Sequence, residues 1–321
     1  MATSSRSERV KRGSVTFDGL LQVAAILTVV FSVLTAIDTR QHYIELFSHF
    51  RLQYLVVSLL LLIACAVRRR NFCALILAVS VAVNASYVVP WYADGEAATG
   101  ETRLRLLYAN VLSTNRDHER VLELINSEQP DIIFLQEITP HWLEALQALQ
   151  ADYPFDYSVP REDNFGIAVW SRLPLSAASH IDSPPLGYPT ILASTTIGGV
   201  EITFISTHPM IPLGGANFAA RNQQFLAVSE LAAQTRGEVI LLGDLNASIW
   251  DRHYLNFEDA TGLKNARRGY GILPTWPTFM PPAMIPIDHV LVSERVGIAD
   301  IRTGPRIGSD HLPLVVTVTP P

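Results

Sequence analysis

Three long apolar stretches in the first third of the chain contrast with everything that follows them. Residues 19–37 run for 19 positions without a charge, residues 52–67 for 16, and residues 72–92 for 21. A helix of roughly 20 apolar residues spans a bilayer, so these stretches predict three transmembrane helices; the second gains length if His49 and Phe50 are included. Buried helices of a soluble core are disfavoured, because these segments have almost no polar face.

The basic residues between these stretches predict their orientation. The segment before the first stretch and residues 68–70 are rich in Arg and Lys, whereas the connection between the first two stretches has only Arg40 and Arg51. The positive-inside rule therefore places residues 1–18 in the cytoplasm as a tail. Three spans then carry the chain after residue 92 to the other side of a cell (inner) membrane. The Trp91–Tyr92 pair is typical of a membrane interface.

The pattern changes after residue 92. Residues 93–102 are small and polar, which predicts a linker between the membrane domain (19–92) and the remainder, 103–321. Amphipathic helices are expected within residues 115–130, 139–150 and 221–237. Apolar runs predict strands at 104–110, 131–137, 165–171, 201–208, 238–244, 287–293 and 312–319. Many strands with a few helices between them predict one α/β (α+β) domain of two packed β-sheets flanked by helices.

Composition narrows the partners of this C-terminal part. From residue 101 onward it carries 15 Lys and Arg against 24 Asp and Glu, a balance of −9. Proteins that hold long nucleic acids usually present a basic surface, so nucleic acid is disfavoured as a partner. Both cysteines, Cys65 and Cys73, lie in the apolar segments, so there is no disulfide framework. The sequence indicates no protein partner.

Polar residues with ligand or acid–base chemistry stand at the ends of the apolar runs. Asp244 and Asn246 follow one strand directly, and strand alternation would put both side chains on one side. A simple turn is the alternative, since Gly, Asp, Asn and Ser are common turn formers. The same pattern recurs at the other strands, with Asn110, Glu137, His208, Asp288, Asp310 and His311. Such residues are expected to converge on one pocket at the edge of the sheets.

These short blocks, taken in order, carry a resemblance to a known family. They are LLYANVL, FLQEI, FGIAVWSR, STHP, GDLNAS, PIDHVLVS and GSDHLPL, within residues 103–319. The chain resembles the endonuclease/exonuclease/phosphatase superfamily, which includes deoxyribonuclease I, apurinic endonucleases, neutral sphingomyelinases and inositol-polyphosphate phosphatases. It looks most like bacterial membrane-anchored members. The resemblance implies a four-layered α/β sandwich and metal-dependent hydrolysis of phosphoester bonds.

The resemblance also implies a metal site built from oxygen ligands. Glu137 matches the family's metal-binding glutamate, with Asn110 beside it and Asp310 as a further contributor. Hard oxygen ligands suit Mg²⁺, with Mn²⁺ as a substitute. A cation there would offset negative charge on the phosphoryl oxygens and the leaving group.

The remaining matches imply the acid–base and binding groups for in-line attack by an activated water. His311 matches the histidine that faces the scissile phosphate, and Asp288 matches the carboxylate that orients it. Asp244 would activate the water or protonate the leaving group. Asn246 and His208 would donate hydrogen bonds to phosphoryl oxygens.

Three further positions are interpreted from their local context. Arg221 is a candidate for substrate binding, although a surface ion pair is the alternative, and Trp276 either lines the pocket rim or covers a sheet edge. His289 points away from its neighbour Asp288 in a regular strand and is interpreted as structural. The apolar loop 210–218 is a candidate for contact with lipid.

Three functions compete. The leading hypothesis is a membrane-tethered, divalent-metal-dependent phosphoesterase acting outside the cytoplasm on a small or lipid-linked phosphoester. The second is an extracytoplasmic nuclease; DNA-cutting members often have an acidic residue where this chain has Leu112, which counts against it. The third is a non-catalytic binding or sensor protein, which retention of Glu137, Asp244 and His311 disfavours. An inverted topology with the domain in the cytoplasm is disfavoured by the arginines at 68–70.

Overall fold

The structure is a computed structural model that describes residues 16–35, 42–93, 98 and 102–321. Several expectations therefore fall outside the described residues. These are the basic positions of the predicted tail up to residue 15, the connection that contains Arg40, and most of the predicted linker 93–102.

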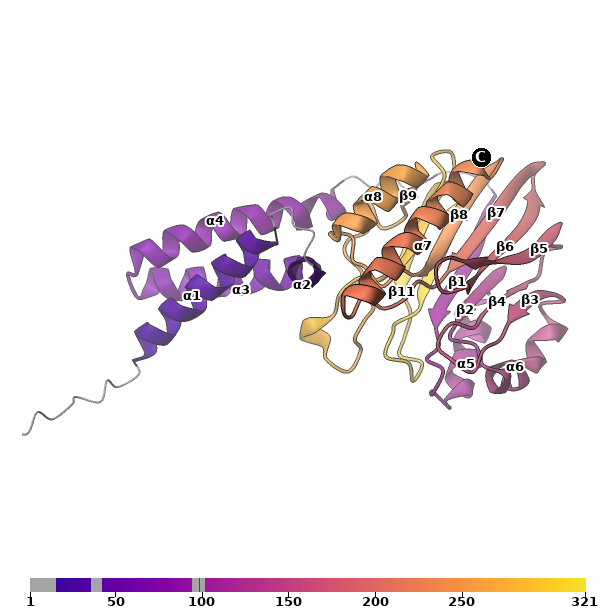
Figure 1. Cartoon of the computed structure of the whole chain (residues 1–321), viewed down its shortest axis with the longest axis horizontal. Helices are drawn as coiled ribbons and strands as arrows, with labels where there is room; N and C mark the ends of the chain where they lie inside the picture. The colour runs from indigo at the N-terminus through magenta and orange to yellow at the C-terminus, as the bar shows by residue number, and fades with distance from the viewer. Residues whose placement is uncertain (1–15, 36–41, 94–97, 99–101) are drawn as a thin grey trace, which may run out of the picture.

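The N-terminal part is a helical bundle at one end of the molecule (Figure 1). It consists of α1 (Phe17–Leu34), α3 (Arg51–Val67) and α4 (Asn71–Val88), with α2 (His42–Leu46) and a 3₁₀ turn, η1 (Phe47–Phe50), leading into α3. Within the part of the chain that the structure describes, three helices are long and apolar enough to cross a membrane: Phe17–Leu34, His42–Val67 and Asn71–Tyr92, with mean hydropathies of 2.0, 2.2 and 2.2. The second is longer than its apolar run, because α2 and η1 continue directly into α3.

A small polar cluster joins the three helices inside this bundle. The hydroxyls of Ser58 and Ser80 lie 2.8 Å apart, and Asn84 Nδ2 donates to Ser32 Oγ at 3.0 Å. Arg51 Nη1 donates to the carbonyl oxygen of Ser32 at 3.2 Å. Small residues allow helices in a membrane to approach closely, and hydrogen bonds between them stabilise one packing arrangement. This cluster therefore defines how the three helices pack.

The C-terminal part contains two six-stranded sheets (Figure 1). The first has the order β11-β12-β1-β2-β4-β3 and the second β5-β6-β7-β8-β10-β9. The strands are β1 (Leu104–Asn110), β2 (Ile132–Gln136), β3 (Phe155–Val159), β4 (Ile167–Ser171), β5 (Ala177–Ser183), β6 (Tyr188–Ile197), β7 (Val200–Thr207), β8 (Glu238–Asp244), β9 (Lys264–Asn265), β10 (Asp288–Val292), β11 (Gly297–Thr303) and β12 (Leu314–Thr319).

Each sheet contains one parallel pair, and this arrangement positions the site. β1 runs parallel to β2 and β7 runs parallel to β8, whereas β12 is antiparallel to β1 and β10 is antiparallel to β8. The carboxyl ends of a parallel pair lie at the same edge, and an antiparallel neighbour begins there. The strand ends that carry polar residues therefore meet at one edge of the two sheets.

Helices cover the outer faces of both sheets and complete four layers, which confirms the expected sandwich. α5 (His118–Glu128) and α6 (Pro140–Ala145), followed by η3 (Gln147–Ala151), pack on the first sheet. α7 (Gly215–Gln234) and α8 (Arg252–Thr261) pack on the second. The inner faces of the sheets enclose the central core, in which Phe134 and Phe204 pack with ring centroids 5.3 Å apart. The sequence prediction missed five strands, β3, β5, β6, β9 and β11, together with α8.

The third apolar helix ends inside the C-terminal core, which corrects the expectation for Trp91. The backbone continues from α4 through η2 (Val89–Tyr92), and Trp91 is buried in the cluster under α8. The carbonyl oxygen of Trp91 accepts hydrogen bonds from the amides of Gly269 and Gly271, at 3.0 and 2.9 Å. Trp91 therefore attaches the end of the third helix to the C-terminal domain. Of the Trp91–Tyr92 pair, Tyr92 is the exposed residue.

Candidate active site

The polar residues at the strand ends gather around one cavity of about 260 Å³. The first sheet contributes Glu137 after β2 and His311 before β12. The second contributes His208 after β7 and Asp244 at the end of β8. All four side chains are buried. The pocket predicted from the strand ends is thus present, and it lies between the two sheets at their common edge.

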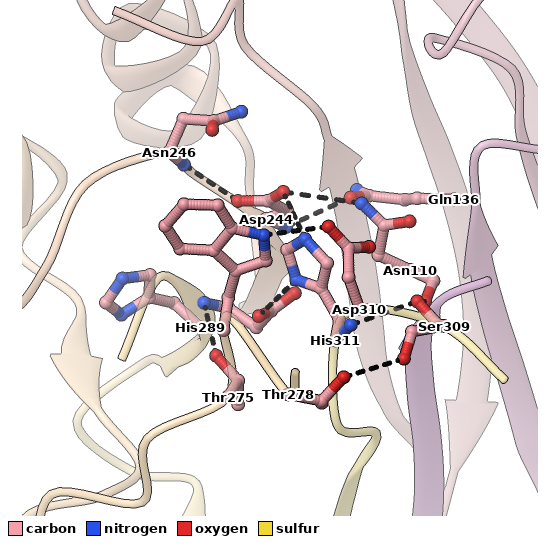
Figure 2. A network of polar contacts seen from close by, with 12 residues as sticks. Asn110, Gln136, Asp244, Asn246, Thr275, Thr278, His289, Ser309, Asp310 and His311 are labelled. Atoms are coloured by element: carbon pink, nitrogen blue, oxygen red, sulfur yellow. Dashed lines mark hydrogen bonds and ion pairs between the residues drawn. The ribbon is translucent and has the colours of Figure 1, made fainter. Parts of the chain in front are cut away.

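His311 lies beside Asp244 (Figure 2) and forms an ion pair with Asp288. His311 Nδ1 donates to Asp288 Oδ2 at 2.8 Å, and both side chains are buried. Burial lowers the pKa of His311, but the carboxylates of Asp288 and Asp244 outweigh it and raise that pKa to about 10. Although burial opposes it, His311 lowers the pKa of Asp288. The pair therefore holds an imidazolium whose Nε2 faces the pocket.

The Asp244 carboxylate lies at the centre of the cluster. Its Oδ2 is 3.6 Å from His311 Nε2, 3.5 Å from His208 Nε2 and 3.4 Å from Asn110 Nδ2. Burial alone would lower the pKa of His208, but the hydrogen bond that the ring donates to the Asp244 carboxylate raises that pKa above its usual value. The imidazole rings of His208 and His311, from different sheets, therefore both face the Asp244 carboxylate. Their N–H groups are in place to donate to an anion bound next to Asp244.

Glu137 is held at the end of β2 by two hydrogen bonds. Its Oε1 accepts from Asn110 Nδ2 at 3.0 Å, and its Oε2 accepts from the amide of Ser113 at 2.9 Å. Its backbone is left-handed, with φ of 63°, which costs free energy in a residue other than glycine. The strained backbone turns the side chain from the strand end into the pocket, next to Asn110.

Asp310 shares this pocket with Trp276. Trp276 Nε1 donates to Asp310 Oδ2 at 2.9 Å, and both residues line the cavity. The other carboxylate oxygen, Asp310 Oδ1, is buried and has no hydrogen-bond partner. A buried acceptor without a partner is costly unless a bound group satisfies it.

The donor set of this pocket fits a divalent cation. Three carboxylates line it, from Glu137, Asp244 and Asp310, and among the described residues no Lys or Arg does. A phosphate anion would be repelled by these carboxylates unless a cation accompanied it. The carboxylates of Glu137 and Asp310 offer hard oxygen atoms of the kind that Mg²⁺ and Mn²⁺ prefer, and Asp310 Oδ1 is an acceptor without a partner. Asn110 turns its Nδ2 towards Glu137, and its Oδ1 accepts from the amide of Leu112 at 3.0 Å.

A second group of potential ligands lies close by. Asp244, Asp288 and His311 bring three ligand atoms within 4.8 Å of one another. However, the hydrogen bond between His311 and Asp288 already uses one atom of each. A metal ion bound through His311 Nδ1 would have to break this bond, so the group around Glu137 is the better candidate.

Asn246 corrects the expectation drawn from strand alternation. β8 ends at Asp244, and Asn246 has a left-handed φ of 50°. The amide of Asn246 donates to Asp244 Oδ1 at 2.9 Å, so the two residues form a turn, the alternative that the sequence left open. Asn246 lines the pocket, and its Nδ2 donates to the carbonyl oxygen of Pro209 at 3.0 Å, which uses one of its two amide protons.

Arg221 does not reach the pocket, and the expectation that it binds substrate is not met. Arg221 belongs to α7, its side chain is fully buried, and its Nη1 lies 2.9 Å from Asp251 Oδ2. Nη1 also donates to the carbonyl oxygen of Asn246 at 3.2 Å. Arg221 therefore supports the loop after β8 from behind, and the ion pair that formed the alternative interpretation is buried rather than exposed.

Two buried residues that the sequence analysis missed connect the sheets beneath the pocket. Gln136 Oε1 accepts from the amide of Asp244 at 3.0 Å, and its Nε2 donates to the carbonyl oxygen of Thr207 at 2.8 Å. The hydroxyl of Tyr108 lies 2.9 Å from both Gln136 Oε1 and Asp288 Oδ1. Gly243 permits this approach, because a Cβ atom there would lie 1.9 Å from the Thr207 oxygen. A polar residue in a fully apolar strand was the available signal for Gln136.

His289 lies beside Asp288 and points away from His311, as its strand position predicted (Figure 2). Its Nε2 lies 2.7 Å from the carbonyl oxygen of Ala247, and its Nδ1 lies 3.1 Å from Asn265 Nδ2. These partners suit a neutral ring with its proton on Nε2. Burial, with Arg267 nearby, lowers the pKa of His289 to about 3.

The fold is therefore expected to lose stability in acid through His289. In the unfolded chain His289 takes up a proton near pH 6.5, whereas in the folded protein it does so only near pH 3. The free energy of unfolding is therefore not reduced by this residue above pH 6.5, and it falls as the pH drops from 6.5 towards 3. The slope from this one group approaches about 1.4 kcal/mol per pH unit. Melting temperatures of the full chain between pH 7 and 4 should show a shallower dependence in His289→Gln; equal slopes would contradict this.

Fold and site together define a phosphoesterase-type α/β sandwich, and a family comparison agrees. The model of the endonuclease/exonuclease/phosphatase family matches residues 107–311, and the chain belongs to that family. No curated protein sequence matches the chain significantly.

Solved structures with the same fold share little sequence with this chain. The D. rerio TDP2 structure complexed with a single-strand DNA product has a TM-score of 0.59 and 18% identity, over 68% of this chain and 100% of that one. Family proteins from Beutenbergia cavernae and Bacteroides thetaiotaomicron are each 19% identical over 68% of this chain, with TM-scores of 0.54 and 0.55. The matches cover 71% and 97% of those two chains. These similarities show the fold.

Proposed function

We propose that this protein is a membrane-tethered, divalent-metal-dependent phosphoesterase that acts outside the cytoplasm on a small or lipid-linked phosphodiester or monoester. The observation that carries the proposal is a single pocket that holds the paired imidazolium of His311, the carboxylate of Asp244 and the carboxylate of Glu137. Hydrolysis of a phosphoester requires a positively charged hydrogen-bond donor to the phosphoryl oxygens, a group that orients the attacking water, and a site for a cation. His311, Asp244 and Glu137 match these three requirements in that order.

The chain's own residues divide the work as follows. Asp288 fixes the orientation of His311, whose Nε2 donates to a phosphoryl oxygen and offsets the charge that develops there. His208 donates to the same phosphate from the opposite sheet. Asp244, which lies between the two rings, accepts a hydrogen bond from the attacking water and aligns it with the phosphorus.

Glu137, with Asp310 as a further contributor, would hold the metal ion, and the hydrogen bond from Asn110 Nδ2 orients Glu137. When bound, Mg²⁺ or Mn²⁺ supplies positive charge that neutralises the phosphate and stabilises the leaving group. Ser113 supports this role, because its amide holds one oxygen of Glu137 in place.

The membrane helices and the distribution of charge support the cellular location. Three helices are long enough to span a bilayer, which favours their insertion in the inner membrane. The arginines at 68–70 favour a topology in which the C-terminal domain lies outside the cytoplasm. Tethering raises the effective concentration of a membrane-bound substrate at the pocket. The balance of −9 after residue 100 disfavours a nuclease.

The test is hydrolysis by the purified full chain in detergent, with Mg²⁺, with Mn²⁺ and with chelator. The substrates are a chromogenic phosphodiester, a chromogenic phosphomonoester, single-stranded and duplex DNA, and a phospholipid mixture. We expect metal-dependent hydrolysis of the chromogenic or lipid substrates and little cutting of DNA. Preferential cutting of DNA would favour the nuclease hypothesis, and a metal-loaded folded protein that hydrolyses none of these would refute the proposal.

A further inference from the structure

The pocket has a second half that the chemistry of phosphoester hydrolysis does not use. Besides the catalytic groups, much of its wall consists of apolar side chains, among them Leu46, Ile211, Pro212, Leu213, Ile285 and Ile287. A phosphate has no favourable contact with such a surface, whereas a hydrocarbon group gains free energy by leaving water for it. The apolar half therefore indicates a substrate that carries an apolar group next to its phosphate.

Part of this wall comes from the membrane domain. Leu46 ends α2 and His49 lies in η1, within the segment 42–50 that joins the first and second apolar helices, and both line the cavity. Figure 1 shows α2 between the helical bundle and the two sheets. The catalytic residues are all more than 50 positions away in the sequence. The sandwich by itself therefore leaves this side of the pocket open.

Specific contacts hold the segment 42–50 against the catalytic domain. His49 Nδ1 lies 2.8 Å from Ser248 Oγ and accepts from the amide of Ser248 at 3.2 Å. Glu45 Oε1 accepts from the amide of His253 at 3.4 Å and lies 4.0 Å from Arg221 Nη2. His49 and Glu45 are both buried. Leu46 lies between these two anchors in the sequence, and its place in the wall follows from them.

The same side of the domain presents exposed apolar residues close to the start of a membrane helix. α3 begins at Arg51, directly after η1, and Gln53 Nε2 donates to the carbonyl oxygen of Met284 at 2.8 Å. The pocket residues Ile211 and Leu213 are 41% and 60% exposed. The loop that leads to η4 (Pro281–Ala283) adds Phe279 and Met280, which are 69% and 52% exposed. Apolar residues exposed beside a membrane helix are typical of contact with lipid.

We infer that the segment 42–50 completes the substrate site, and that the apolar half of the pocket binds the hydrocarbon part of a lipid phosphoester taken from the bilayer surface. This inference rests on the proposed function and names its substrate class. The phosphate occupies the catalytic half, and the adjoining chain lies against Leu46, Leu213 and Ile285. Leu46 and Leu213 then determine specificity, because they contact the part of the substrate that does not react.

The experiment uses the full chain in detergent with Mn²⁺ and a series of p-nitrophenyl alkyl phosphates from methyl to octyl. We expect kcat/KM to rise about tenfold or more from methyl to octyl, because each buried methylene adds favourable transfer free energy. The octyl-to-methyl ratio is the kcat/KM for the octyl ester divided by that for the methyl ester. In Leu46→Asp and in the surface variant Leu213→Asp, this ratio should fall below about twofold. Leu226→Asp, at a residue 66% exposed on α7 and outside the pocket, should keep the wild-type ratio.

A second arm separates a lipid of the bilayer from an apolar phosphoester in water. A hexadecyl ester is placed either in the vesicles that contain the protein or in separate vesicles, and it should be hydrolysed only in the first case. Equal hydrolysis in both cases, no chain-length dependence in the wild type, or an unchanged ratio in both pocket variants would overturn the inference. Failure to hydrolyse any ester of the series, from methyl to hexadecyl, would instead count against the proposed function.

Discussion

Replacing His311 with alanine is expected to lower kcat for a chromogenic phosphodiester by about a thousandfold, within the range found for positioned acid–base and electrostatic groups. His311 is the only residue of the described pocket that holds an ion pair as short as 2.8 Å with a buried carboxylate while it faces the cavity. Alanine removes both the donor and its positive charge and leaves the strand ends unchanged. Steady-state kinetics in saturating Mn²⁺ measure the loss.

Two further variants test the role assigned to His311. His141→Ala, at an exposed histidine of α6, should keep wild-type activity. Asp288→Asn should retain the fold but lower the pKa of the imidazolium, because the carboxylate that raises it is gone. The pH profile of kcat should then shift to lower pH. A His311→Ala enzyme that keeps more than about a tenth of the activity would assign the chemistry to other groups.

Glu137→Gln is expected to remove metal binding, the second large effect. The amide replaces a charged ligand by a neutral one of the same size, and hard cations bind carboxylates far better. At a metal concentration of a hundred times Kd, binding to the folded state alone stabilises a protein by about 2.7 kcal/mol. Wild-type protein should therefore melt at a higher temperature in Mn²⁺ than in chelator, and Glu137→Gln should show no such difference.

Activity and a matched control complete this test. We expect kcat/KM of Glu137→Gln to fall by at least about a hundredfold, the upper range for weakened metal sites. Glu144→Gln, at an exposed glutamate of α6, removes the same charge outside the pocket and should keep both the Mn²⁺-dependent shift and the activity. If Glu137→Gln keeps the shift, the metal is held elsewhere, and the group formed by Asp244, Asp288 and His311 becomes the candidate.

Local patterns predicted most of the elements around the site, for an identifiable reason. β1 and β8 have the predicted bounds, and Thr139 caps α6 by accepting from the amide of Trp142 at 3.2 Å. The central strands β2, β4, β8 and β10 are mostly apolar and buried along their whole length, because each is covered on both faces in a four-layered sandwich. The strands that were missed lie at or near the sheet edges and carry mixed polarity; β5, for example, is mostly exposed.

The start of the helix expected within residues 115–130 shows where local reasoning was insufficient. α5 begins at His118 after Asp117, and Asn115 instead donates to the carbonyl oxygens of Val111 and Ile307, at 3.1 and 3.0 Å. An asparagine can bond to a neighbouring backbone or to a distant one, and the sequence around it does not distinguish the two. Arg221 and Trp91 were misplaced for a similar reason, since each found a buried partner far along the chain.

The sequence by itself determined the apolar helices, the central strands and the chemical identity of the residues at the strand ends, because each depends on periodicity or on residue type over a short window. Only the tertiary structure decided that His311 pairs with Asp288, that Gln136 joins the two sheets, and that Leu46 of the N-terminal helical part lines the pocket. These contacts join residues that are distant in the sequence. They depend on the order of strands in the sheets and on the docking of α2, which no local pattern of residues contains.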